Sequence, residues 1–311
     1  MTKAADHASP YRLRKQLPEP AGTPVRRLLR WALLMLPPIR RMHTERSRAI
    51  LELDHERFNT GLRYLSDCGT AADQARVLAL FRLFSPLAVS VLMTRIGHRG
   101  DGGYVMADCF ASVHAAFSFG IADETSWDEA VARRGIPVYQ YDGTIDRPPV
   151  KDPRFTFHKK MIGPQQDAST ESIASVLATH GAPGNGNILK LDIEGTEWEI
   201  FDTVSSDDLR RFSQIVCEFH GFQHIDDPAW YSRALRGMIK LRSLFEVVHV
   251  HANNGGHLAI FANVPFPIVL EVTFLSKSGY SFGRIDKTFP TPLDAPSSPH
   301  FADIFLGSFQ F

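Results

Sequence analysis

The chain has 311 residues, 44% of them hydrophobic, and its 34 basic side chains are balanced by 34 acidic ones. A chain of this length buries roughly 75% of its unfolded surface, so the composition supports a large core. The neutral balance argues against a dedicated nucleic-acid binder, which would carry a basic excess. The three cysteines are too far apart for a CxxC pair or a disulfide framework, which favours a reducing compartment. We therefore expect a cytoplasmic protein.

The chain divides into an N-terminal tail with a helical extension, residues 1–90, and a larger domain, residues 91–311. Residues 24–42 carry apolar side chains at helical spacing, with arginines off that stripe and no acidic residue. Such a basic helix can lie on the inner face of an anionic membrane. The alternative is that its stripe packs on the protein core. Further helices are predicted near 44–66 and 71–92, with Pro86 kinking or ending part of the second. No apolar run is long enough to span a membrane.

From residue 114 onward, strand and helix patterns alternate, which indicates a parallel sheet. The turn 252–256 predicts an antiparallel hairpin between the last two strands. The expected fold is a Rossmann-like α/β domain with a mostly parallel seven-stranded sheet and an antiparallel end hairpin. Strands are predicted near 114–119, 136–141, 154–158, 187–193, 214–219, 245–251 and 257–263, and helices near 126–134, 170–180, 196–204 and 228–243.

The first strand of this pattern leads into a tight turn at Gly120. Ser126 and Glu129 have the spacing of a capping box, so a helix is predicted to begin there. The next strand ends at Asp142, 22 residues after Gly120. In a βαβ unit, an acidic residue at this place accepts hydrogen bonds from the ribose of a cofactor. Gly120 and Asp142 are therefore predicted to bind a cofactor, and the alternative for Asp142 is a simple turn residue.

The turn after this strand is acidic. Asp123 and Glu124 would repel a pyrophosphate at a helix N-terminus. A cofactor without phosphate and with positive charge, such as S-adenosylmethionine, suits these residues better. The alternative is that these two acidic residues only stabilise the N-terminus of the following helix through the helix dipole. Upstream, Asp101-Gly-Gly-Tyr104 is either a hairpin turn or a flap in which Tyr104 stacks on the adenine of the cofactor.

Three later strands end in polar pairs at i, i+2 spacing, so that the two members of each pair share a face. Ligands of open parallel sheets bind outside the carboxyl ends of the strands, and charged residues buried there without partners would be costly. We therefore predict a site at this edge. The pairs are Asp192 and Glu194, Glu218 and His220, and His249 and His251.

One of these strand ends resembles a known family. The segment from Lys190 to Glu197, Lys-Leu-Asp-Ile-Glu-Gly-Thr-Glu, is similar to the Lys-x-Asp-Ile-Glu-Gly-x-Glu signature of FkbM-type methyltransferases. The Asp-Gly-Gly-Tyr-Val, Ser-Phe-Gly-Ile and 269–275 segments resemble a neighbouring methyltransferase-like branch, so that the resemblance runs from about Arg95 to Leu275. The single glycine at position 120 departs from the usual three-glycine loop.

The resemblance implies a class I methyltransferase fold, S-adenosylmethionine as the donor, and often O-methylation of a polyketide or sugar hydroxyl. Asp192, Glu194 and Glu197 occupy the matching signature positions. We expect the acceptor to be a hydroxyl of a glycan, polyketide or other small metabolite. Glu194 and Asn253 are assigned to substrate binding, and Asp192 to both the cofactor and the reaction.

Transfer of a methyl group to a hydroxyl needs proximity and removal of the hydroxyl proton. The catalytic residues are predicted to be Asp192, Glu218, His220 and His251. Either histidine could act as the base, or the four side chains could bind a divalent metal ion. Two rival functions also remain open from the sequence. They are a metal-dependent enzyme of another class that uses these same four residues, and a non-catalytic membrane-docking protein on the same fold.

Overall fold

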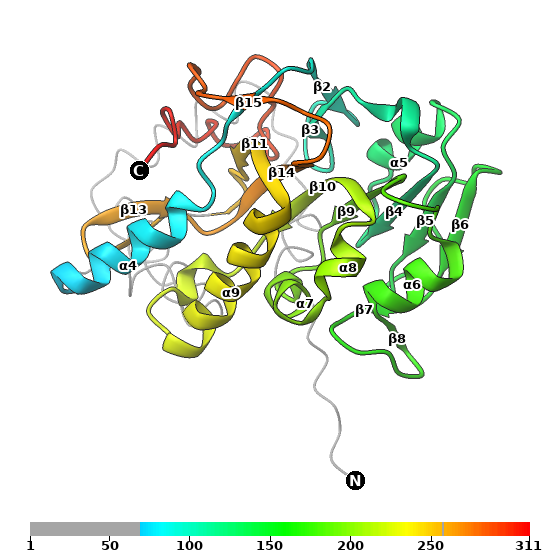
Figure 1. Cartoon of the computed structure of the whole chain (residues 1–311), viewed down its shortest axis with the longest axis horizontal. Coiled ribbons are helices and arrows are strands. Elements are labelled where there is room, and N and C mark those ends of the chain that lie inside the picture. The colour runs from blue at the N-terminus through cyan, green and yellow to red at the C-terminus, as the bar shows by residue number, and fades with distance from the viewer. Residues whose placement is uncertain (1–68, 257) are drawn as a thin grey trace, which may run out of the picture. The chain divides into compact units, whose positions relative to one another are not determined.

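The structure, a computed structural model, describes residues 69–256 and 258–311 (Figure 1). These residues belong to one compact unit, Ser66–Phe311. The helices predicted at 24–42 and 44–66, with the proposed membrane contact, lie outside the described residues. Within the described part of the chain, no helix is both long and apolar enough to cross a bilayer.

A seven-stranded sheet forms the centre of this unit, in the order β11-β14-β10-β9-β4-β5-β6. Six of the strands run parallel, and β14 is antiparallel to both of its neighbours. From β4 the chain builds the sheet first toward β5 and β6 and then, on the other side, toward β9 and β10, so that the strand order reverses beside β4. The strands are β4 (Ala115–Phe119), β5 (Val138–Tyr141), β6 (Phe155–His158), β9 (Asn187–Leu191), β10 (Phe212–Phe219), β11 (Phe245–Ala252) and β14 (Leu270–Ser276).

The predicted hairpin between 245–251 and 257–263 is wrong. After β11 the chain leaves the main sheet and forms a separate two-stranded hairpin from β12 (Leu258–Phe261) and β13 (Val264–Pro267). Strand β14 takes the place beside β11 instead. Burial explains the choice, because six of the seven β14 residues are buried, whereas β12 exposes alternate apolar side chains. A strand that is apolar on both faces belongs inside a sheet.

Helices cover both faces of the sheet. Figure 1 shows α7, α8 and α9 gathered on one side. There Trp198 and Phe201 of α7 pack on Phe219 of β10, with ring centroids 4.6 and 5.6 Å apart. The opposite face carries α5 and the antiparallel hairpin of β2 (Met93–Ile96) and β3 (Tyr104–Ala107). The helices are α4 (Ala71–Arg82), α5 (Ser126–Ala132), α6 (Ile173–His180), α7 (Glu197–Thr203), α8 (Ser206–Leu209) and α9 (Pro228–Leu244), with short 3-10 turns at Phe110–Ser112 and Phe222–His224.

Helix α4 is shorter than the predicted helix over 71–92. It ends at Arg82, and the chain then passes through Pro86 into short strands. Proline lacks a backbone N–H and disfavours helical backbone at the preceding residue, which explains the early end. The α4 side chain Phe81 stacks on Phe222 at 5.3 Å between centroids, which fixes this helix on the domain. The small strands are β1 (Ala88–Val89), β2 (Met93–Ile96), β3 (Tyr104–Ala107), β7 (Met161–Ile162), β8 (Thr170–Glu171) and β15 (Phe282–Gly283).

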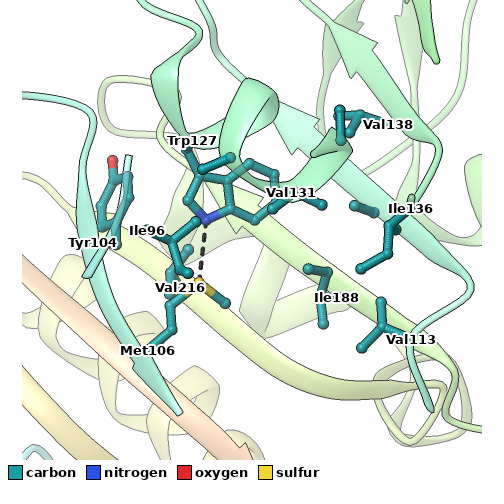
Figure 2. Close-up of a cluster of buried hydrophobic side chains, with 13 residues drawn as sticks. Ile96, Tyr104, Met106, Val113, Trp127, Val131, Ile136, Val138, Ile188 and Val216 are labelled. Atoms are coloured by element: carbon teal, nitrogen blue, oxygen red, sulfur yellow. Dashed lines mark hydrogen bonds between the residues drawn. The ribbon is translucent and has the colours of Figure 1, made fainter. Parts of the chain in front are cut away.

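A cluster of buried apolar side chains holds α5 and the β2–β3 hairpin on the sheet (Figure 2). Trp127 of α5 is fully buried, and its indole Nε1 donates to the sulfur of Met106 in β3 at 3.2 Å. Below them lie Ala116, Ile188 and Val216 of the sheet. This packing places the turn before α5 and the turn between β2 and β3 next to the carboxyl ends of the central strands.

Candidate active site

The strand register places one row of polar positions across the carboxyl edge of the sheet. Ser118 is the Cα partner of both Gln140 and Lys190, and Lys190 is the partner of Val216. Residues two positions further along a strand lie on the same face. The residues two positions beyond Gln140, Ser118, Lys190 and Val216 are Asp142, Gly120, Asp192 and Glu218. The row continues through the pairs Glu218 with Glu271 and His251 with Glu271. We call this set the edge row, and its members are Asp142, Gly120, Asp192, Glu218, Glu271 and His251.

Gly120 is required by a close approach of two backbones. Its φ is +74°, and a Cβ built on it would stand 1.7 Å from the carbonyl oxygen of Asp192. Its N–H donates to the Tyr141 carbonyl at 3.0 Å, and its own carbonyl accepts from Lys190 Nζ at 2.6 Å. The turn after β4 therefore crosses the end of β9 with no room for a side chain.

Asp142 holds this turn from the end of β5. One carboxylate oxygen accepts from the N–H groups of Ile121 at 3.1 Å and Ala122 at 2.8 Å. The other accepts from the N–H of Thr144 at 2.7 Å and from its hydroxyl at 2.6 Å. Burial raises the pKa of Asp142, but these hydrogen bonds outweigh burial and lower it below the usual value. The carboxylate is thus ionised at the predicted cofactor position, and the turn already uses both of its oxygens.

Helix α5 begins at Ser126 as predicted, but the predicted capping box does not form. The N-cap residue is Thr125, whose side chain caps no backbone N–H. The Thr125 hydroxyl contacts the Glu129 carboxylate at 3.4 Å instead. The N–H of Ser126 is taken by the carboxylate of Glu124. Glu124 therefore has a local structural role at the helix start.

The turn between β2 and β3 docks on the same loop. His98 Nδ1 lies 3.3 Å from a Glu124 carboxylate oxygen, and the His98 N–H donates to the Ser126 hydroxyl at 2.9 Å. A Cβ on Gly102 would stand 2.2 Å from the Glu124 side chain, so this contact is tight. Asp123 is exposed on the same turn. The two glycine-containing turns therefore form one surface beside the edge row.

Tyr104 does not form the predicted flap. Its side chain is 2% exposed within the cluster of Figure 2, so the ring offers no open face to an adenine. Its hydroxyl donates to Asp192 at 3.1 Å. Burial, with help from Asp192, raises the pKa of Tyr104 well above its usual value, so the hydroxyl keeps its proton. The hairpin interpretation of the Asp-Gly-Gly turn is confirmed by the pairing of β2 with β3.

The structure brings Asp192, Glu218 and His220 together, as the sequence predicts. One ligand atom of each lies within 4.8 Å of the others. Glu218 and His220 are 4% and 8% exposed, and Glu218 Oε1 lies 3.5 Å from His220 Nε2. The Asn253 amide donates to Glu218 at 2.8 Å. Burial and the charge of Asp192 raise the pKa of Glu218 well above its usual value. We call these three residues the acceptor cluster, after the role in the reaction that the sequence analysis predicts for them.

Glu197 supports His220 from the first turn of α7. This fully buried carboxylate lies 3.0 Å from His220 Nδ1 and also accepts from the N–H groups of Ile193 and Gly195, both at 3.2 Å. Burial alone lowers the pKa of His220, but Glu197 and Glu218 together raise it well above its usual value. Sequence reasoning gives Glu197 only as a signature match and misses its contact with His220, since the two lie 23 positions apart.

Glu194 sits at the rim of the acceptor cluster. Its φ of +63° lies in the left-handed region, which is uncommon for a residue other than glycine. Its side chain is 48% exposed, and one carboxylate oxygen is 3.6 Å from His220 Nε2. The predicted substrate-binding residue is therefore open to solvent and next to the cluster.

His251 does not join the acceptor cluster, so the predicted convergence of all four side chains is wrong at this position. It is 1% exposed, and its two ring nitrogens lie 2.9 Å from Glu271 and 3.0 Å from Asp303. Burial lowers the pKa of His251, whereas Glu271 and Asp303 raise it, to about 10. His249 pairs in the same way with Asp294 at 2.8 Å. Both histidines thus fasten the C-terminal segment to β11.

The strand order, with β14 antiparallel between β10 and β11, defines a Rossmann-like class I methyltransferase fold. Residues 130–254 match the family model described as the methyltransferase FkbM domain. The matched region contains Asp142, Glu197 and the whole acceptor cluster. This match confirms the resemblance seen at the Asp-Ile-Glu-Gly segment, and it shows that residues 130–254 are similar to the methyltransferase FkbM domain.

Two solved structures resemble the chain more remotely. A candidate hemolysin from Streptococcus thermophilus is 12% identical over 58% of this chain and 63% of its own length, with a TM-score of 0.29. A variant of the 16S rRNA (adenine(1408)-N(1))-methyltransferase from Catenulisporales acidiphilia is 13% identical over 62% of this chain and 100% of its own, also at 0.29. Similarity at this level carries no functional argument. No curated protein matches the sequence.

Proposed function

We propose that this protein transfers a methyl group from S-adenosylmethionine to a hydroxyl of a glycan, polyketide or other small metabolite. The edge row is the observation that carries the proposal. Its members Asp142 and Asp192 flank Gly120 at the point where the strand order reverses, and ligands of open α/β sheets bind in the crevice at that point. The acceptor cluster begins with Asp192 and continues on the next strand with Glu218 and His220.

The residues around Gly120 fit a cationic cofactor that has no phosphate. The turn from Gly120 to Ser126 contains Asp123 and Glu124 and no basic residue. Lys190 in β9 is 3% exposed, and its ammonium donates to the Gly120 carbonyl and lies 3.7 Å from Asp192. A phosphate group would therefore meet the negative charge of Asp123 and Glu124 at this turn. When bound, S-adenosylmethionine supplies a methyl group on a positively charged sulfur together with a positively charged ammonium.

The chain has separate groups for the donor side and the acceptor side. Asp142 keeps the turn after β4 in place, and the ribose hydroxyls would take over the hydrogen bonds that Thr144 makes to one of its oxygens. On the acceptor side the sulfur–carbon bond breaks as the oxygen–carbon bond forms, and the acceptor hydroxyl loses its proton. Asp192, Glu218 and His220 are the side chains that assist this loss, and Glu194 at the rim is placed to contact the acceptor.

Calorimetric titration of the full chain with S-adenosylmethionine and S-adenosylhomocysteine tests the donor. Both ligands should bind with one site per chain. NAD is the matched control, because it shares the adenosine but carries a pyrophosphate that the acidic turn should reject. Absence of binding by both adenosyl ligands, or equal binding of NAD, would refute the assignment of the donor.

A further inference from the structure

We propose that the acceptor cluster is a site for a divalent cation of the first transition row. It holds two carboxylates and one imidazole, with ligand atoms within 4.8 Å of one another. Octahedral ligands at bond lengths near 2.1 Å stand about 3 Å apart when adjacent. The 3.5 Å between His220 Nε2 and Glu218 Oε1 is already close to that spacing. Small side-chain movements would therefore complete the coordination.

Each carboxylate of the cluster is oriented by a neutral donor from outside it. The Tyr104 hydroxyl donates to Asp192 at 3.1 Å, and the Asn253 amide donates to Glu218 at 2.8 Å. Neither donor brings a positive charge that would neutralise the carboxylates. Groups that orient ligands in this way are the usual second layer of protein metal sites.

The imidazole shows the same arrangement. His220 Nδ1 faces the buried Glu197 at 3.0 Å, which leaves Nε2 as the ligand atom. The His220 residue is 8% exposed, and Nε2 lies 3.5 and 3.6 Å from Glu218 and Glu194, beyond ordinary hydrogen-bond length. A buried nitrogen that faces carboxylates at this distance is placed to share a cation with them. The carboxylate–histidine–metal arrangement fixes the ring and its tautomer.

The charge around the cluster also favours a cation. Asp192, Glu218 and Glu194 bring three carboxylates to one edge, and Glu197 lies behind His220. Lys190 Nζ is 3.7 Å from Asp192 and also donates to the Gly120 carbonyl at 2.6 Å, so one ammonium faces this group of carboxylates. Mixed oxygen and imidazole ligands suit Mn²⁺ and its neighbours.

The chemical role of this cation rests on the proposed function. Three protein ligands leave coordination positions for oxygens of the acceptor, so an acceptor with two neighbouring oxygens, such as a sugar diol, would be selected. A bound cation lowers the pKa of a coordinated hydroxyl. The proton then passes to solvent water as the oxygen–carbon bond forms and the sulfur–carbon bond breaks.

The test uses Mn²⁺ alone on the full chain after chelator treatment, with free Mn²⁺ followed by electron paramagnetic resonance. We expect one bound Mn²⁺ per chain. Glu218→Gln and His220→Asn should weaken binding by more than about tenfold, and Glu197→Gln by roughly 10–100-fold. Glu199→Gln is the matched control, because Glu199 lies on the same helix as Glu197 but pairs with Arg233. Its Mn²⁺ affinity should equal that of the wild type.

Failure to bind Mn²⁺, or wild-type affinity in both Glu218→Gln and His220→Asn, would overturn the cation site. Thermal unfolding checks that each variant is folded. If one of them does not fold, Asp192→Asn is measured in its place. Titration of the metal-free protein with S-adenosylhomocysteine separates this inference from the proposed function. If the adenosyl ligand binds but Mn²⁺ does not, only the cation site is refuted. If Mn²⁺ binds but the adenosyl ligand does not, only the assignment of the donor is refuted.

Discussion

Gly120 and Asp192 approach each other so closely that a single methyl group at position 120 would stand 1.7 Å from the Asp192 carbonyl oxygen. The contact joins the turn after β4 to the end of β9. It therefore joins the loop assigned to the cofactor to the strand that carries the first member of the acceptor cluster. The carbonyl of Gly120 is held in turn by the buried Lys190.

Gly120→Ala should disrupt this contact and lower both stability and adenosyl-ligand affinity. The matched control is Gly135→Ala, because Gly135 has a similar φ of +81° but a methyl group there would meet nothing within 4 Å. The control should cost about 1–2 kcal/mol from the left-handed backbone alone. Gly120→Ala should cost a further ~1–3 kcal/mol or more from overpacking. Denaturant unfolding gives both values, and equal losses would contradict the close approach.

Asp142→Ala should lower affinity for S-adenosylhomocysteine by on the order of 1.5–3 kcal/mol, the scale of a hydrogen bond to a charged group. The variant removes the carboxylate offered to the ribose and also the four hydrogen bonds that hold the turn. Thr144→Val is the control, since it removes the hydroxyl hydrogen bond to Asp142 and keeps the carboxylate. Calorimetry on folded variants decides, and unchanged affinity in Asp142→Ala would reject its cofactor role.

Glu218→Ala and His220→Ala should leave adenosyl-ligand affinity nearly unchanged and lower turnover by roughly 10²–10⁴. Both side chains belong to the acceptor cluster, and they lie two strands away from the turn at Gly120. The measurement is methyl transfer from a labelled donor to a hydroxyl acceptor, with affinity measured on the same preparations. Full activity in both variants would mean that the cluster is structural and that the chemistry lies elsewhere.

Local patterns predict the sheet well but not its antiparallel end. Apolar runs between turn signals locate β4, β5, β6, β9, β10 and β11 to within a few residues. The glycine-rich turn after β11 suggests a hairpin, but β14 pairs there from further along the chain. Which of two later strands joins a sheet depends on burial of both faces in the folded state, and short sequence windows do not contain that information.

In the candidate site, too, local sequence patterns identify some residues correctly and fail for others. Pairs at i, i+2 on strand ends identify Asp192, Glu218 and His220, because strand periodicity and a common sheet edge are enough to bring them together. His251 satisfies the same pattern, yet it lies outside the acceptor cluster. Its partners come from β14 and from Asp303 in the C-terminal segment, 52 positions away. Nothing local in the sequence distinguishes a histidine in the site from one that pairs with a distant carboxylate.

The pairing of His251 with Asp303 predicts a loss of stability in alkaline solution. The folded pKa of His251 is raised to about 10 from 6.5, so its contribution is complete below pH 6.5 and is lost as pH rises through 10. Asp303→Asn should lower the folded pKa and shift this loss to lower pH. Urea unfolding of both proteins between pH 6.5 and 10 gives the difference, in which lysine and tyrosine titrations cancel. Parallel profiles would contradict the ion pair.

Asp128 should make the protein less stable at neutral pH than at pH 4. It is fully buried in the first turn of α5, and one of its oxygens accepts from the Gln140 amide at 2.8 Å. Burial raises its pKa from 3.8 to about 6, although Lys190 and Gln140 oppose this shift. Between these two pKa values the folded state binds the proton and the unfolded state does not, so stability falls as pH rises.

Asp128→Asn keeps the accepting oxygen and removes the ionisation. It should therefore be more stable than the wild type at pH 7, by on the order of 1–3 kcal/mol, and equal to it below pH 4. The surface variant Asp146→Asn, whose residue is exposed beside Lys159, should show no such gain at pH 7. Urea unfolding from pH 4 to 7.5 measures both differences, and a pH-independent gap between Asp128→Asn and the wild type would rule out the buried ionisation.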